Sequence, residues 1–100
     1  MDATMIAARV TESYASFFLT PNGDDVSRNT LIAMVGAFEV RLVGLPSVNA
    51  PAGLSLWVEL YSQDLHSVDS RKCNDLDEAI EAATLLAIQA GELYKKAAPG

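Results

Sequence analysis

The sequence contains only one cysteine and one histidine among its 100 residues. A single cysteine, Cys73, excludes an intramolecular disulfide, and Cys73 with His66 is too small a set for a tetrahedral zinc site. With only one imidazole, most catalytic sites that use histidine as an acid, a base or an activator of a nucleophile are excluded. We interpret His66 as a surface residue beside a turn and Cys73 as structural, and we expect no metal, no cofactor and no enzymatic activity.

Long apolar runs and catalytic motifs are missing as well. No stretch approaches the ~18 uninterrupted apolar residues of a membrane span, and the start of the chain lacks the basic and apolar regions of a signal peptide. Phosphate-binding glycine loops, serine-nucleophile motifs and zinc-helix motifs are also absent. These absences predict a cytoplasmic protein that does not contact a membrane.

Positive charge is scarce, because 13 acidic residues face seven basic ones and the net charge is −6. The acidity belongs to the C-terminal half, where eight acids stand against Arg71 and Lys72 between Leu56 and Tyr94. Binding to nucleic acid needs lysine and arginine to displace phosphate counterions, so a direct nucleic-acid partner is not expected. A protein or ribonucleoprotein with a basic surface fits this charge better.

Half of the residues are hydrophobic, which is enough for one core, and we expect residues 1–100 to form a single domain. Apolar residues recur at helical spacing over Ala3–Leu19, with Ser13 on the polar side, and Thr20–Asp25 is typical of a turn. The apolar residues of Val26–Gly44 fit the helical period in one part and the strand period of two in another. We favour a short helix from about Ser27 to Val35, a break at Gly36, and a strand from about Ala37 to Val43.

The second half of the chain gives clearer signals. A loop over residues 45–53 precedes an alternating strand, Leu54–Tyr61, and His66–Lys72 is interpreted as the weaker, edge-side arm of a hairpin. A capped helix from about Asp75 to Lys95 follows, with acids in its first turn and lysines in its last. The expected fold is two-layer α+β, with a three-stranded antiparallel sheet packed with helices in the order α-α-β-β-β-α.

Two features suggest binding surfaces. Leu85 and Ile88 fall among the acids of the last helix, either as the apolar centre of an interface or as a second side buried by the first helix. Trp57 and Tyr61 share one face of the Leu54–Tyr61 strand, either as interface anchors or as a surface covered by the N-terminal helices.

The segments Leu54–Tyr61 and Asn74–Ala83 together resemble the C-terminal part of small bacteriophage accessory proteins. With its size and acidity, the chain resembles the anti-CRISPR class, whose members inactivate CRISPR effector complexes by binding them. The resemblance implies that an acidic surface occupies a Lys/Arg-lined groove that otherwise holds nucleic acid, acting as a DNA mimic in the host cytoplasm. The residues we expect to bind the partner are Glu59, Asp64, Asp69, Glu78, Glu81 and Glu92, with Leu85, Ile88, Trp57 and Tyr61 as apolar anchors.

Two other roles remain open. Leu85, Ile88 or the Trp57 face would join two copies in a homodimeric structural or accessory phage protein. Alternatively, the acidic face would cap a basic nuclease, as an immunity protein or antitoxin does.

Overall fold

The computed structural model describes residues 3–19, 28–47, 54–62, 64 and 66–97, which form two helices and four strands. The elements follow the chain in the order α1 (Ala3–Leu19), β1 (Arg28–Val35), β2 (Phe38–Pro46), β3 (Leu54–Tyr61), β4 (Ser67–Cys73) and α2 (Leu76–Ala97). The α+β class is confirmed. The expected turn over Thr20–Asp25 and most of the expected loop over residues 45–53 lie outside the described residues.

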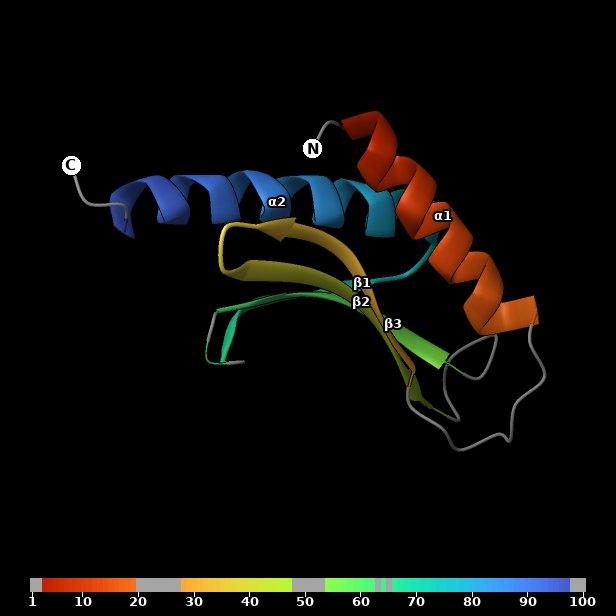
Figure 1. Cartoon of the computed structure of the whole chain (residues 1–100). Helices are drawn as coiled ribbons and strands as arrows, with labels where there is room; N and C mark the ends of the chain where they lie inside the picture. Colours follow the sequence, from red (N-terminus) through yellow and green to blue (C-terminus); the bar gives the residue numbers. More distant parts are fainter. Residues whose placement is uncertain (1–2, 20–27, 48–53, 63, 65, 98–100) are drawn as a thin grey trace.

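The strands form one antiparallel sheet in which each strand pairs with its neighbour in sequence, in the order β1-β2-β3-β4. Both described helices lie on the same side of this sheet, with α2 spanning it and α1 crossing α2 (Figure 1). The helix α2 contacts all four strands, whereas α1 contacts only β1 and β2. The opposite side of the sheet, which we call the open face, carries neither of these two helices.

The expected short helix over Ser27–Val35 is wrong, because Arg28–Val35 forms the edge strand β1. Sequence alternation is hidden here by a bulge between Leu31 and Ala33, where the register shifts and Ile32 and Ala33 are both buried. Gly36 then turns the chain back at a positive φ of 59°. The order is therefore α-β-β-β-β-α, with four strands rather than three.

The helix α2 begins as its sequence predicts. The backbone N–H of Glu78 donates to Asp75 Oδ1 at 2.8 Å, and the N–H of Asn74 donates to Glu78 Oε1 at 2.8 Å. Its inner side is rich in alanine, with Ala79, Ala83 and Ala90 fully buried against the sheet. Small side chains allow the helix to approach the strands closely, so larger residues from the sheet fill the space between the layers.

The core lies between the helices and the sheet. It is built from three groups of buried side chains, namely Ile6, Val10 and Phe17 on α1, Ile32, Val40, Leu42, Leu56, Val58 and Leu60 on the strands, and Leu86 with the alanines on α2. The expected buried side of α1 is confirmed at Ile6, Val10 and Phe17. Ser13 is buried although its position predicted exposure, because α1 is flanked by both α2 and the sheet.

Candidate functional site

The exposed side of α2 carries a regular row of residues that we call the outer stripe. Its members are spaced alternately by three and four positions and are all exposed: Glu78, Glu81, Leu85, Ile88, Glu92 and Lys95. Such spacing keeps side chains on one line along a helix. Leu85 is 43% exposed and Ile88 is 56% exposed, so the alternative in which α1 buries them is wrong.

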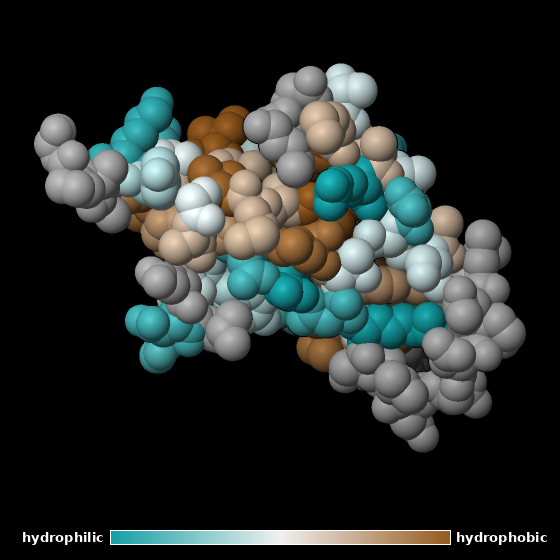
Figure 2. Space-filling model, in the orientation of Figure 1, coloured by the Kyte–Doolittle hydropathy of each residue, from teal (hydrophilic) through white to brown (hydrophobic). Residues whose placement is uncertain are grey.

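The centre of the outer stripe adjoins an apolar hollow. The hollow has a volume of about 350 Å³ and is lined by Ala3, Ile6, Val35, Thr84, Ala87 and Ile88. Figure 2 shows apolar side chains gathered over the middle of α2 and hydrophilic ones toward its C-terminal end. The stripe thus has an apolar centre beside a space that a partner side chain can enter.

The acids of the outer stripe differ in what surrounds them. Glu78 accepts the hydrogen bond from Asn74 and so also holds the helix start. Arg71 and Lys72 line the same shallow hollow of about 250 Å³ as Glu78, Glu81 and Leu85. Of these two cations, Arg71 is paired with the inward-facing Val58, and it offsets part of the negative charge at the N-terminal end of the stripe.

The open face of the sheet holds a second group of the expected residues. Trp57, Glu59 and Tyr61 alternate with the buried Leu56, Val58 and Leu60, as the sequence predicts. The Tyr61 hydroxyl donates to Glu59 Oε1 at 2.6 Å. This hydrogen bond, with partial burial and the charge of Glu59, raises the pKa of Tyr61 to about 12.

Sequence reasoning missed a polar network beside these residues. Arg41 lies opposite Glu59 in the ladder between β2 and β3. Its guanidinium donates two hydrogen bonds to Glu39 Oε1, at 2.6 and 2.9 Å, and one to Asn29 Oδ1 at 2.8 Å. The signal was present in the alternation of Glu39 and Arg41 with Phe38, Val40 and Leu42, but the pairing with Asn29 depends on β1, which sequence reasoning placed in a helix.

The expected binding residues therefore divide between two sides of the molecule. Glu78, Glu81, Leu85, Ile88 and Glu92 share the outer stripe, whereas Trp57, Glu59 and Tyr61 lie on the open face. Of the remaining two, Asp64 is exposed between β3 and β4, and Asp69 lies on the edge strand β4 and accepts the N–H of Ser70 at 2.8 Å.

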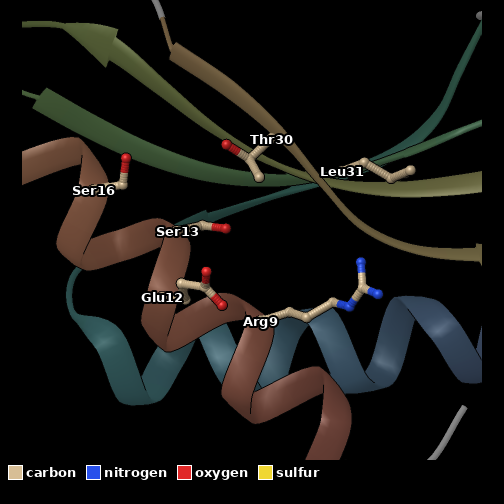
Figure 3. Close-up of a pocket in the computed structure, with 6 residues that line it drawn as sticks. All are labelled: Arg9, Glu12, Ser13, Ser16, Thr30 and Leu31. Carbon is tan, nitrogen blue, oxygen red and sulfur yellow. The ribbon is translucent and has the colours of Figure 1, made fainter.

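A further cleft of about 470 Å³ lies between α1 and β1. Figure 3 shows its lining, with Arg9, Glu12, Ser13 and Ser16 on α1 and Thr30 and Leu31 on β1. This set holds one cation, one carboxylate and three hydroxyls, but neither an imidazole nor a thiol. It therefore offers no nucleophile paired with a histidine base.

Cys73 and His66 lie in different surroundings. Cys73 is buried in the core, and burial raises the pKa of its thiol to about 11, with the negative charge of Glu78 as a further cause. His66 is exposed beside the β3–β4 connection. Among the described residues, no three His, Cys, Asp or Glu side chains gather closely enough to hold a metal ion.

No described helix is both long and apolar enough to cross a bilayer. Comparison of the chain with protein-family models, with curated proteins and with solved structures gave no match.

Proposed function

We propose that this protein is a non-enzymatic binding protein that places the outer stripe of α2 in a groove of a basic protein or ribonucleoprotein. The observation that carries the proposal is the exposure of Leu85 and Ile88 between carboxylates, on a helix whose other side is packed. An apolar centre inside a charged rim is the usual anatomy of a protein interface. Apolar anchors three positions apart are typical of a helix bound in a groove.

The chemistry of the stripe defines the partner that fits it. Leu85 and Ile88 require an apolar floor, and the carboxylates of Glu81 and Glu92 require lysine or arginine at the rim. Glu81 and Glu92 flank the apolar pair on opposite sides along the helix. A groove with cations on both sides of an apolar patch satisfies all four side chains.

The narrower form of the proposal is inhibition of a CRISPR effector complex. Such complexes hold nucleic acid in channels lined with positive charge, and the acidic stripe would compete for that channel. The support is the negative charge of the chain together with the resemblance to anti-CRISPR proteins described above.

The test compares two variants with the same change in net charge. Glu81→Lys with Glu92→Lys reverses two charges of the stripe, whereas Glu12→Lys with Asp64→Lys reverses two exposed acids that lie off the stripe, on α1 and on the β3–β4 connection. Asp64, which the sequence placed among the expected binding residues, is not one of the contact residues that we propose. Glu78 is spared because it also caps α2. A purified CRISPR effector complex is the first probe and a basic nuclease the second, with displacement of labelled DNA as the readout.

We expect the wild-type chain and the Glu12/Asp64 variant to displace DNA, and the stripe variant to bind at least about tenfold more weakly, because an interfacial attraction becomes a repulsion. Leu85→Ser with Ile88→Ser should weaken binding as well, by removing the apolar anchors. Equal displacement by all four proteins, each shown by circular dichroism to be folded, would exclude the stripe as the contact surface.

A further inference from the structure

The open face of the sheet differs in charge from the rest of the molecule. Among the described residues, its charged side chains are Glu39, Arg41, Glu59 and Lys72, which sum to zero although the whole chain carries −6. Two copies of an acidic protein repel each other wherever acidic surfaces meet. The open face is a surface on which two copies can approach without that repulsion.

Three of the four charged groups of the open face, Glu39, Arg41 and Glu59, already have partners within it. Arg41 is bonded to Glu39 and Asn29, and Glu59 accepts a hydrogen bond from Tyr61. A charge that keeps its hydrogen bonds on leaving water loses less than an unpaired one. Burying this face therefore costs less than the number of its charged residues suggests.

The apolar part of the open face lies beside this network. Val43 and Trp57 are directly opposite each other in the ladder between β2 and β3, and Leu45 follows on β2. Val43 is 6% exposed, Trp57 is half-buried and Leu45 is 41% exposed. Neighbouring rows of the same two strands thus hold an apolar pair, Val43 and Trp57, and a pair of opposite charges, Arg41 and Glu59.

One twofold rotation brings each of these two rows against the same row of a second copy with matching chemistry. Consider a twofold axis that runs parallel to the strands, between β2 and β3. It places β2 of one copy over β3 of the other, and each row then faces the same row of the second copy. Val43 then faces Trp57 of the second copy, and Arg41 faces Glu59 of the second copy. The four charges at the centre alternate in sign, which is favourable.

A face-to-face dimer with its twofold axis perpendicular to the strands lacks this pairing of opposite charges. A twofold axis perpendicular to the strands places β2 over β2, so Arg41 meets either itself or Val43. The register between β2 and β3 therefore selects one dimer.

We infer that the open face is the interface of a homodimer, in which Trp57 of each copy lies over the Val43–Trp57 row of the other and Arg41 pairs with Glu59 across the twofold axis. A C2 interface uses the same patch on both copies, as this one does. The inference does not rest on the proposed function, because the outer stripe lies on the other side of the sheet and stays free in both copies (Figure 1).

The wild-type chain provides the first test. Trp57 is the only tryptophan, so its fluorescence reports directly on the proposed interface. We expect sedimentation to show a dimer that dissociates on dilution, with Trp57 emission moving to longer wavelength over the same concentration range. A monomer at the highest soluble concentration, or a dimer whose dissociation leaves the emission unchanged, would overturn the inference.

The second test exchanges the charges. Arg41→Glu places two carboxylates against each other across the axis, and Glu59→Arg does the same with two guanidinium groups. We expect each variant alone to dimerise at least about tenfold more weakly. An equal mixture of the two should form a heterodimer, because the two carboxylates of the row then lie on one copy and the two guanidinium groups on the other, so that every facing pair is again of opposite charge. Failure of the mixture to associate, with both variants folded, would overturn the proposed register.

The control is Ile88→Ser, which changes the outer stripe and should leave the dimer unaffected. Loss of dimerisation in this variant, with the Trp57 emission unchanged, would assign self-association to α2 instead. Should Arg41→Glu fail to fold because it loses its bonds to Glu39 and Asn29, the concentration dependence of wild-type Trp57 fluorescence remains decisive.

Discussion

Gly36 at the β1–β2 turn lies against the aromatic ring of Tyr94 near the end of α2. A Cβ atom at Gly36 would overlap that ring, and the residue also has a φ of +59°. We predict that Gly36→Ala destabilises the protein by about 1–2 kcal/mol from its left-handed backbone alone, with an added cost from the overlap. The free energy of unfolding in urea measures this cost, as the difference that Gly36→Ala makes in the wild-type chain and in the Tyr94→Ala variant. A smaller cost in the Tyr94→Ala background identifies the contribution of the ring, whereas equal costs would show that the ring moves aside freely.

The hydrogen bond from Tyr61 to Glu59 makes stability depend on pH at the alkaline end. The folded pKa of Tyr61 is raised from 10.0 to about 12, so the stabilisation is fully present below pH 10 and is lost as pH rises through 12. We predict that Glu59→Gln lowers the pKa of Tyr61 toward its ordinary value, because the charge that opposes ionisation is removed. Ultraviolet absorbance of tyrosinate follows the titration, with Glu12→Gln on α1 as the control. An unchanged pKa in Glu59→Gln would mean that the negative charge of Glu59 does not contribute to the shift.

Cys73 should react slowly with thiol reagents in the folded protein. Its pKa is raised from 9.0 to about 11, which lowers the thiolate fraction at neutral pH by about 100-fold, and its side chain is also buried. We predict labelling that is limited by unfolding and becomes fast in urea. Rapid labelling of the native chain would contradict the buried position of Cys73 under α2.

Local signals were sufficient to predict several elements. The cap at Asp75, the acids after it and the final lysines indicate where α2 starts and ends, and regular alternation indicates β3. Each of these signals lies within the element itself. The helix α1 was confirmed over Ala3–Leu19 for the same reason.

The strand β1 was missed because its signal depends on its partner. Its bulge between Leu31 and Ala33 removes the period of two, and the spacing of Leu31, Met34 and Val35 imitates a helix. Only the pairing with β2, completed through the turn at Gly36, gives these residues an extended conformation. A pattern taken from one strand alone does not contain that information.

The candidate site was predictable in its residues but not in its exposure. The sequence placed Leu85 and Ile88 among acids, and it placed Trp57 and Tyr61 on one face of a strand. Whether each group faces solvent depends on where α1 packs, and α1 packs across α2 and over β1 and β2, leaving the outer stripe and the open face uncovered by it. This is a tertiary relationship between the two ends of the chain.

The packing of α1 on α2 also sets an order for folding during synthesis. Each strand pairs with the one made just before it, so the sheet can grow hairpin by hairpin as the chain leaves the ribosome. The apolar side of α1, with Ile6 and Val10, makes its most extensive contact with α2, which is synthesised after all four strands. A chain truncated before Leu76 would expose this side of α1 and the inner face of the sheet, and should aggregate rather than fold.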